Sequence, residues 1–299
     1  MAEPLIEGRI GVVGLGSMGF GIATSLLRAG FETEGLDVSA QRVAAFTAEG
    51  GAAPGSGVLA ALVVVVVNGD QMRQAVFAPV ALADRLAPGG LIVACPTIGP
   101  DAARAFAREA EARGFLYLDA PISGGSAKAA SGELTVMVSG APAAMRAARP
   151  ILDAIATTVF PLGDSAGPAS AMKIVNQLLA GVHIAAAAEA ITFGMAQGIA
   201  PADTLSVISR CAGTSWMFEN RGPHIVAGDY TPHSAVDIFI KDLGLVAETA
   251  ANARFAAPLA ATAQQLFLAA GGSGLGREDD AAVAKVYARN AGLTLPGGA

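Results

Sequence analysis

One lysine in the second half of the chain is a candidate acid/base. Lys173 is the only lysine or arginine between Arg149 and Arg210, and its predicted helix otherwise holds apolar and small residues. Asn176 and Gln177 follow about one turn further along the same face. A lysine whose pKa falls from about 10.4 toward about 7–8 can exchange a proton near neutral pH. Alternatively, a lysine at a helix start simply extends to water.

A glycine-rich turn near the N-terminus predicts a dinucleotide site. It separates a predicted strand, Arg9 to Val13, from an apolar-periodic segment that runs to Ala29. Three glycines at this spacing allow a tight turn, close approach of backbone N–H groups to a pyrophosphate, and close helix packing. The alternative is a turn that serves packing only. The candidate cofactor contacts here are Gly14, Leu15, Gly16, Ser17, Met18 and Gly19.

An aspartate bears on which nicotinamide cofactor is used. Asp37 ends the next predicted strand, Phe31 to Leu36, about 20 residues on, where a carboxylate accepts the ribose 2′-hydroxyl. A 2′-phosphate would bring negative charge against it, so NAD is favoured over NADP. Arg42 lies a helical turn further on and could swing onto a phosphate, which keeps NADP as the lesser alternative. Asn68 is a further cofactor-binding candidate.

A proline- and glycine-containing segment is a candidate anion site. Asp119-Ala-Pro-Ile-Ser-Gly-Gly125 follows the last strand of the predicted parallel set, and so lies at the carboxyl edge where open α/β sheets bind ligands. The Ser123 side chain and the amides of Gly124 and Gly125 could bind a carboxylate. An ordinary Pro/Gly turn explains the local sequence equally well.

The elements that must position these residues indicate an α/β Rossmann-type doubly wound sheet followed by an all-α C-terminal domain. We expect the NAD-binding domain at residues 1–166 and the substrate and dimerisation domain at residues 167–299. Helices are predicted at Gln71–Leu86, Asp101–Arg113, Pro142–Ile155 and Ala169–Gln197. The remaining predicted strands are Leu62–Val67, Leu91–Ala94, Phe115–Leu118, Glu133–Ser139 and Thr157–Pro161, of which the last two extend the same sheet.

Composition excludes several classes of protein. The net charge of −6 and the pI near 5.1 offer no basic stripe for nucleic-acid phosphates. The only cysteines, Cys95 and Cys211, lack the spacing of a disulfide framework or a zinc site, so no metal is expected and a reducing cytoplasm fits. The apolar run Leu59–Val67 is far shorter than the roughly 20 residues that span a membrane. We expect no signal peptide in the first eight residues.

Three motifs together resemble the β-hydroxyacid dehydrogenases. They are the segment from Asp119 to Gly125, the stretch from Gly167 to Lys173 that continues Ile-Val-Asn-Gln, and Lys241-Asp-Leu243, in that order and spacing over essentially the whole chain. The resemblance implies an NAD-dependent oxidoreductase in which Lys173 is the acid/base. It also implies that Ser123, Gly124 and Gly125 bind the substrate acid, and that Lys241 and Thr97 contact the cofactor. Asn176 is a further substrate-binding candidate, and either Asn176 or Gln177 could orient the lysine ammonium.

Two longer stretches resemble the L-threonate dehydrogenase branch of that family. They run from Gly213 to Arg221 and from Gly228 to Leu243. His233 places a polar group where many relatives have Pro-Gly-Phe, which suits a polyhydroxy acid, or else marks a surface turn. Gln177 stands where the family's substrate-binding Asn is common, so we expect it to alter substrate contacts.

The resemblance implies hydride transfer from C2 of a four-carbon sugar acid to NAD. Interconversion of 3-hydroxyisobutyrate or of tartronate semialdehyde is the alternative within the family. A non-catalytic dinucleotide-binding protein is the alternative outside it, because a fold alone does not dictate chemistry. The alanine-rich segment Ala185–Ala188 permits close packing of helices across domains or between subunits. A homodimer or homotetramer is expected, without nucleic acid or membrane partners.

Overall fold

The computed structural model describes residues 8–78 and 81–298. The predicted absence of a signal peptide concerns residues that lie mostly outside this description. The chain divides into two compact units, the first ending at Lys173 and the second beginning at Ile174. This division falls inside one long helix, α7 (Pro168–Ala196). Each unit is described by itself.

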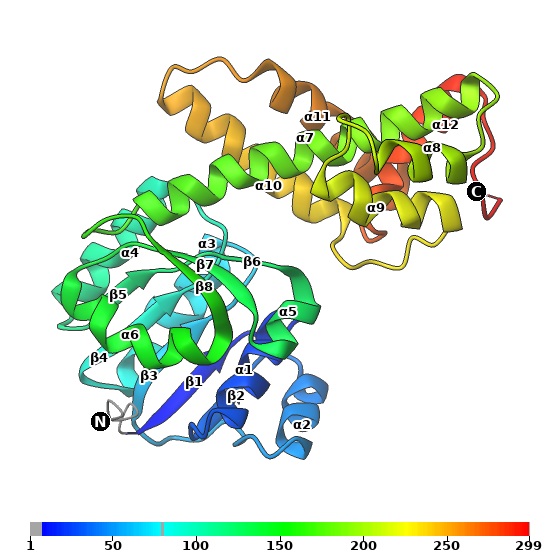
Figure 1. Cartoon of the computed structure of the whole chain (residues 1–299). Coiled ribbons are helices and arrows are strands. Elements are labelled where there is room, and N and C mark those ends of the chain that lie inside the picture. The colour runs from blue at the N-terminus through cyan, green and yellow to red at the C-terminus, as the bar shows by residue number, and fades with distance from the viewer. Residues whose placement is uncertain (1–7, 79–80, 299) are drawn as a thin grey trace. The chain divides into compact units, whose positions relative to one another are not determined.

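The first unit is built on a parallel five-stranded sheet with the order β2-β1-β3-β4-β5 (Figure 1). The strands are β1 (Arg9–Val13), β2 (Thr33–Leu36), β3 (Leu59–Val64), β4 (Leu86–Ala94) and β5 (Leu116–Asp119). Its helices include α1 (Gly19–Arg28), α2 (Ala40–Ala48), α4 (Pro100–Ala112) and α6 (Pro142–Ile155). The predicted doubly wound sheet is confirmed.

The central strand β3 lacks an alternation of polar and apolar residues because both of its faces are covered. Ala61 and Val63 pack into one core, which includes residues of α1 and α6, whereas Leu62 and Val64 pack into another, which includes residues of α4. All four side chains are fully buried. A strand covered on both faces needs apolar residues at every position. The strand ends at Val64, three residues earlier than predicted, so the rest of the valine run leads toward the carboxyl edge.

The prediction that the last two strands extend the same sheet was wrong. β7 (Leu134–Val138) and β8 (Ala156–Pro161) form a separate three-stranded sheet with β6 (Ile122–Ser123). The chain continues from β5 into β6 and reverses only between β6 and β7, so β7 pairs antiparallel with β6. A single bridge between Asp119 and Ser139 links the two sheets.

The predicted helix Gln71–Leu86 is broken into short pieces. The structure has α3 (Gly69–Met72), a π-helical turn (Arg73–Phe77) and a 3₁₀ turn (Leu82–Arg85), and β4 begins at Leu86. Proline at position 79 cannot donate an amide hydrogen bond, which a continuous helix through this segment would require.

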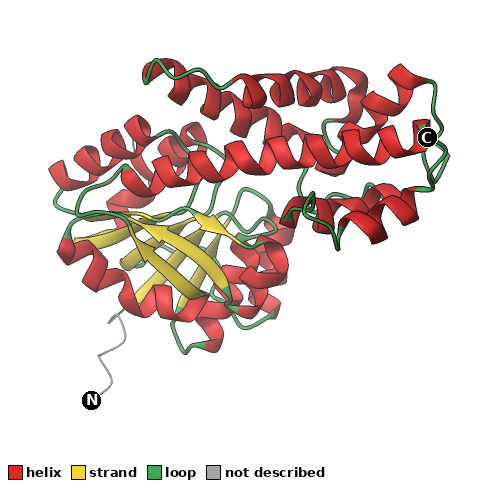
Figure 2. Ribbon diagram, turned by 45° about the horizontal axis from the view of Figure 1, so that its top comes forward, coloured by secondary structure: helices red, strands yellow, loops and turns green. Residues whose placement is uncertain are grey.

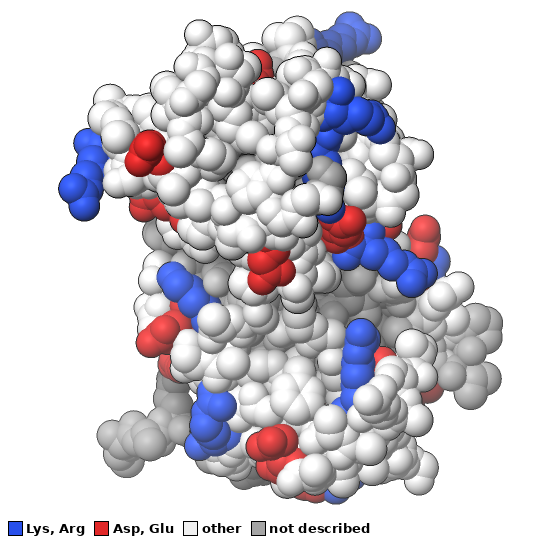
Figure 3. Space-filling model, turned by 90° about the vertical axis from the view of Figure 1, so that its right-hand side faces the viewer, with Lys and Arg blue, Asp and Glu red and all other residues white. Residues whose placement is uncertain are grey.

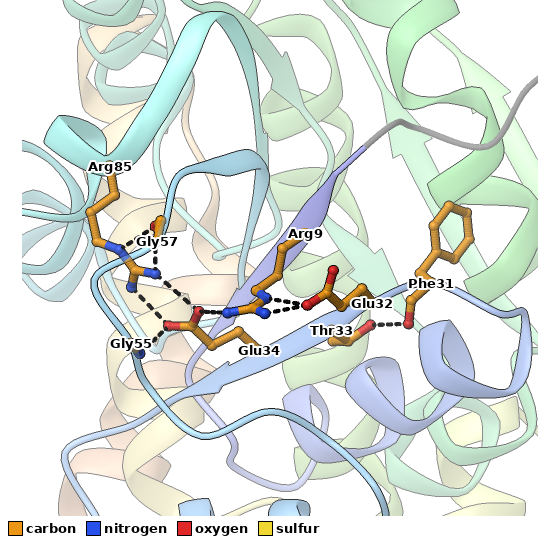
Figure 4. Close-up of polar contacts among 8 residues, drawn as sticks. All are labelled: Arg9, Phe31, Glu32, Thr33, Glu34, Gly55, Gly57 and Arg85. Carbon is orange, nitrogen blue, oxygen red and sulfur yellow. Dashed lines mark hydrogen bonds and ion pairs between the residues drawn. The ribbon is translucent and has the colours of Figure 1, made fainter.

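A buried ionic network lies at the amino edge of the sheet (Figure 4). The Glu34 carboxylate on β2 is fully buried and accepts two hydrogen bonds from Arg85, at 2.7 and 2.9 Å. The amide of Gly55 donates to the same carboxylate at 3.0 Å, and Arg9 Nη1 lies 3.6 Å from it. Arg9 also pairs with Glu32 on its other side. Burial raises the pKa of Glu34, but the hydrogen bonds and the arginine charges outweigh it and lower the pKa.

The described residues of the second unit form helices and connecting loops, and their one β feature is an isolated bridge between Ala235 and Asp279 (Figure 2). It holds the greater part of α7, then α8 (Pro201–Ile208), α9 (Trp216–Ala227), α10 (Val236–Asn252), α11 (Pro258–Ala270) and α12 (Val283–Ala291). Residues from α7, α9, α10, α11 and α12 share one hydrophobic core. The predicted all-α domain is confirmed.

Two further features concern the charge of the surface and the hydropathy of the helices. On the face drawn in Figure 3, side chains of both charges are scattered among white ones. Among the described residues, α7 alone is long and apolar enough to cross a membrane, with a mean hydropathy of 1.6 over its most apolar window. Half of that window is buried inside the protein, and the core helix of a globular protein passes the same test.

Candidate active site

The glycine turn after β1 has the geometry that a dinucleotide site requires. Gly14 has φ +91, and a Cβ there would lie 2.4 Å from the Val65 carbonyl oxygen. A Cβ on Gly19 would lie 1.8 Å from the Gly14 carbonyl oxygen, so both positions exclude any side chain. At Gly16, by contrast, no described atom lies within 4 Å of a Cβ, which leaves its backbone open to a ligand. These residues fit the pyrophosphate of NAD.

The three other residues of the turn differ in exposure. Leu15 is buried in the core and offers only its backbone, whereas Ser17 is exposed and Met18 is half-buried. Helix α1 begins directly after them. The N–H groups of this first turn and the positive end of the helix favour an anion.

Asp37 is fixed beside the turn by backbone hydrogen bonds. Its Oδ2 accepts from the amide of Leu15 at 2.7 Å and its Oδ1 accepts from the amide of Ser39 at 2.8 Å. Arg42 Nη1 lies 3.6 Å from Oδ2, and the arginine side chain is 55% exposed. Each carboxylate oxygen keeps a lone pair for a ribose hydroxyl. The same loose pair leaves a guanidinium within reach of a 2′-phosphate.

Asn68 and Thr97 follow neighbouring strands of the sheet. Asn68 comes after β3 and its Oδ1 accepts from the amide of Gln71 at 2.9 Å, which caps the short helix α3. Thr97 is half-buried in the turn between β4 and α4. Because β1, β3 and β4 are parallel neighbours, both turns lie at the same carboxyl edge as the glycine turn.

The candidate acid-binding loop joins β6 to the short helix α5 (Gly125–Ser131). Ser123 is half-buried and pairs with Thr135 of β7. Gly124 and Gly125 have φ +137 and +78, a region that L side chains rarely adopt. The backbone therefore accounts for both glycines, and their binding of a carboxylate stays a prediction.

Asp119, which begins this segment, was not singled out from the sequence as a site residue. It is buried, at the end of β5, and its Oδ2 accepts from the amides of Gly167 and Ser170 at 2.9 and 3.0 Å. The Ser170 hydroxyl donates to Oδ1 at 2.7 Å, and the Ser139 hydroxyl donates to Oδ2 at 3.2 Å. These four donors lower the pKa of Asp119, but burial outweighs them and raises it. The signal was present in the first residue of the Asp-Ala-Pro-Ile-Ser-Gly-Gly motif.

Lys173 lies one helical turn after Ser170, within the first unit. Its side chain is buried, with 7% exposed. In an α-helix the Cα–Cβ bonds tilt toward the N-terminus, so Lys173 leans toward the turn that Asp119 holds. Its role as the acid/base stays a prediction.

A second buried carboxylate organises the candidate residues of the second unit. Gln177 Nε2 donates to Asp242 Oδ2 at 2.5 Å, and Asn176 Nδ2 donates to Gln177 Oε1 at 2.8 Å. Lys241 Nζ lies 2.7 Å from the other oxygen of Asp242. The structure therefore brings Asn176, Gln177 and Lys241 into one network. Asp242, the middle residue of Lys-Asp-Leu, was not singled out from the sequence.

His233 belongs to a polar cluster of the second unit. Its amide donates to Asp279 Oδ2 at 2.9 Å, and its ring lies 4.8 Å from that of His224. Arg221 makes a bidentate pair with the buried Asp280, at 2.5 and 3.0 Å. Burial raises the pKa of Asp280 to about 6 despite this pair. The arginine that ends the Gly213–Arg221 stretch thus has a structural partner, and nothing in these contacts assigns His233 to a substrate.

Two family models together match most of the chain. Residues 9–163 match the NAD binding domain of 6-phosphogluconate dehydrogenase, and residues 167–287 match the NAD-binding domain of NADP-dependent 3-hydroxyisobutyrate dehydrogenase. The first match alone covers more than half of the chain.

Relatives align over nearly the whole length. An L-threonate dehydrogenase of Cupriavidus necator is 48% identical, over 96% of this chain and 98% of its own. An L-threonate dehydrogenase of Escherichia coli K12 is 47% identical, over 97% of each. A crystal structure of 3-hydroxyisobutyrate dehydrogenase from Salmonella typhimurium is 49% identical with a TM-score of 0.89, over 94% of this chain and 100% of that one. The chain belongs to the β-hydroxyacid dehydrogenase family of NAD-dependent oxidoreductases.

Proposed function

We propose that this protein oxidises L-threonate to 2-dehydro-L-erythronate. Five relatives named L-threonate dehydrogenase are 44–48% identical over nearly the whole chain, which supports the substrate. The observation that carries the chemistry is the buried Lys173, one helical turn after Ser170, whose amide binds the carboxylate that begins the acid-binding loop.

The reaction breaks the C2–H and O–H bonds of the acid and forms a C=O bond. NAD, when bound at the glycine turn, supplies the hydride acceptor. Lys173 takes the hydroxyl proton as the carbonyl forms. In this proposal Ser123 and the amides of Gly124 and Gly125 bind the substrate carboxylate, and Asn176 orients the lysine.

The remaining roles are assigned in the same proposal. Asp37 binds the adenosine ribose, and Thr97 and Lys241 contact the cofactor. Asn68 caps helix α3 with its Oδ1, so its side-chain N–H groups can bind the cofactor. Gln177 is a poorer candidate for direct substrate contact than expected, because its amide is engaged by both Asn176 and Asp242. His233 is retained as a candidate only on the resemblance.

A substrate panel tests the proposal directly. NAD reduction is followed with L-threonate and 3-hydroxyisobutyrate, and NADH oxidation with tartronate semialdehyde. We expect kcat/KM for L-threonate to exceed that for either alternative by at least about tenfold, a difference of about 1.4 kcal/mol in transition-state binding. The Salmonella relative gives 3-hydroxyisobutyrate its place in the panel. Measurable NAD binding with no turnover of any acid would support a non-catalytic dinucleotide-binding protein instead.

Lys173→Ala tests the acid/base. Loss of one general acid/base should lower kcat by about 10²–10⁴-fold, because the hydroxyl proton then has no positioned acceptor. NAD affinity should stay within a few-fold, as calorimetry would measure. Lys285→Ala is the matched control, since Lys285 pairs with Glu278 at 2.7 Å and has no proposed role in the reaction. A kcat of Lys173→Ala close to that of the wild type would contradict the assignment of Lys173 as the acid/base.

Assembly and location are part of the same proposal. Val175, Leu179 and Phe193 lie on one side of α7 and remain 54%, 49% and 65% exposed. An apolar stripe of this length favours burial against a second copy, and we propose a homodimer or homotetramer. We propose the cytoplasm as its location. Light scattering of Leu179→Glu should show dissociation. We also propose the domain limits 1–166 and 167–299, which limited proteolysis near residues 163–167 would test.

A further inference from the structure

The N-terminus of helix α7 is capped by two side chains from other parts of the fold. An ordinary N-cap residue offers its own side-chain oxygen to the first-turn amides. The residue before Pro168 is Gly167, with φ +119, and a Cβ there would lie 2.5 Å from Arg104 Nη1. The acceptors come instead from Asp119 at the end of β5 and from Ser139 after β7, whose hydroxyl accepts the Ala169 amide at 3.0 Å.

One carboxylate thereby joins two parts of the proposed site. Asp119 is the first residue of the loop that leads to Ser123, and it also binds the amides of Gly167 and Ser170 in the helix that carries Lys173. Ser170 lies one turn before the lysine and gives Asp119 both its amide and its hydroxyl. A shift of the carboxylate would move the loop and the helix relative to each other.

The charge of this carboxylate also acts on Lys173, whose side chain leans back toward the first turn of α7. A helix N-terminus carries the equivalent of about half a positive charge, which disfavours a protonated lysine nearby. An anionic Asp119 offsets it. The other titratable groups beside Asp119 are Cys95 and Tyr117, and its charge contributes to raising the pKa of each, that of Cys95 to about 12, so both are neutral near pH 7. Arg104, which faces Gly167, is engaged by Asp101 at 2.6 Å.

We propose that Asp119 is a positioning residue for Lys173. It holds the first turn of α7 against the start of the acid-binding loop, and its negative charge keeps Lys173 protonated to a higher pH than the helix N-terminus alone would allow. The inference rests on the proposed role of Lys173 as the acid/base.

Asp119→Asn separates charge from packing. The amide oxygen can take the place of Oδ2, which faces the amides of Gly167 and Ser170 and the Ser139 hydroxyl. The amide nitrogen then meets the Ser170 hydroxyl, which can turn to accept. Glu34→Gln is the matched control, because Glu34 is the other buried carboxylate in this comparison and its partners are Arg85, Arg9 and Gly55.

The protonation of Lys173 can be measured without turnover. The chain has four lysines, so a protein carrying ¹³Cε-lysine gives a sparse NMR spectrum in which Lys173→Arg identifies one signal. We expect Asp119→Asn to lower the titration midpoint of Lys173 by about one pH unit, and Glu34→Gln to leave it within about 0.2. Equal midpoints in the wild type and a folded Asp119→Asn protein would overturn the proposal.

Kinetics supply the second readout. In Asp119→Asn, the part of the pH dependence of kcat that reports the ionisation of Lys173 should move to lower pH together with the NMR midpoint. The affinity for NAD should stay within about twofold of the wild-type value. If that variant does not fold, Ser170→Ala replaces it. We expect its kcat to fall by about threefold to tenfold while its KM for NAD stays unchanged. A wild-type kcat in Ser170→Ala would overturn the inference. A wild type inactive on L-threonate would sink the proposed function alone, because the NMR titration still decides the role of Asp119.

Discussion

Two buried carboxylates of the first unit hold their charge in opposite ways. Glu34, near the start of β2, is met by the guanidinium groups of Arg85 and Arg9, and its pKa is lowered. Asp119, at the end of β5, is met by amide and hydroxyl groups of α7 and Ser139, and its pKa is raised. One is an ion pair and the other is a helix cap.

The difference follows the two edges of the sheet. Ligands of open α/β sheets bind outside the carboxyl ends of the strands, so we assign the ion pair at the opposite, amino edge to stability. At the carboxyl edge, ligands and catalytic groups gather, and an anion held by N–H groups leaves its field directed at its neighbours. We infer that Glu34 stabilises the fold whereas Asp119 positions the chemistry.

The largest expected effect is on stability, from Glu34→Ala. Removing one partner of a buried ion pair leaves the other unpaired, which typically costs about 3–5 kcal/mol. We expect about 3 kcal/mol, because Arg85 keeps 17% exposure and its hydrogen bonds to the Gly57 carbonyl. Urea unfolding would measure it, and kcat of the folded fraction should stay at the wild-type value.

Glu32→Ala is the matched control for that measurement. Glu32 pairs with the same Arg9, but its side chain is 58% exposed. Exposed pairs contribute about 0–1 kcal/mol. Equal losses of stability in Glu32→Ala and Glu34→Ala would show that burial of the ion pair does not decide its contribution, and would break the contrast between the two edges.

Sequence patterns predicted the parts of the molecule that depend on local signals. The glycine spacing, the unbroken valine run and the apolar helices were enough for the parallel sheet and the all-α unit, because periodicity and turn chemistry are local. The separate sheet of β6, β7 and β8 was missed because it depends on a chain reversal between Ser123 and Leu134, and two-residue strands such as β6 carry no periodic signal.

The polar residues that organise the site were harder to predict than those that carry its chemistry. Lys173 stands alone among apolar residues, so its type and position are informative. Asp119 and Asp242 act through partners 51 and 65 positions away in the sequence, Ser170 and Gln177. No spacing rule connects such pairs, and both aspartates lay inside motifs that drew attention to their neighbours.

Asp37 lies between the two extremes and carries the next largest effect. Like Asp119, its carboxylate accepts from two backbone amides, and it also has one arginine partner, where Glu34 has two. Asp37→Asn should weaken NAD binding by about tenfold, since a hydrogen bond to a charged group contributes about 1.5–3 kcal/mol and the amide keeps part of it. The preference for NAD over NADP should narrow as well, because the repulsion of a 2′-phosphate is gone.

Calorimetric titration with both cofactors would measure this change. Arg42→Ala is the matched control: it leaves the carboxylate in place, so NAD affinity should change less than about twofold while NADP binds more weakly. A wild-type ratio of NAD to NADP affinity in Asp37→Asn would mean that the carboxylate does not select the cofactor.

The smallest effects concern how stability depends on pH, and there the two carboxylates should differ in sign. Because the folded-state pKa of Glu34 lies below its ordinary value of 4.5, its stabilisation is present above that value and is lost as the pH falls through the folded pKa. The raised pKa of Asp119 works the other way: its contribution is fully present below 3.8 and is lost as the pH rises through the folded value.

Glu34→Gln and Asp119→Asn make this difference measurable. Urea unfolding of each variant beside the wild type, from about pH 3 to about pH 7, gives two stability differences. The advantage of the wild type over Glu34→Gln should grow with pH, whereas its stability relative to Asp119→Asn should decline. Parallel slopes would mean that the hydrogen bonds from Gly167, Ser170 and Ser139 outweigh burial in the folded protein, so that Asp119, like Glu34, stabilises the fold through its charge.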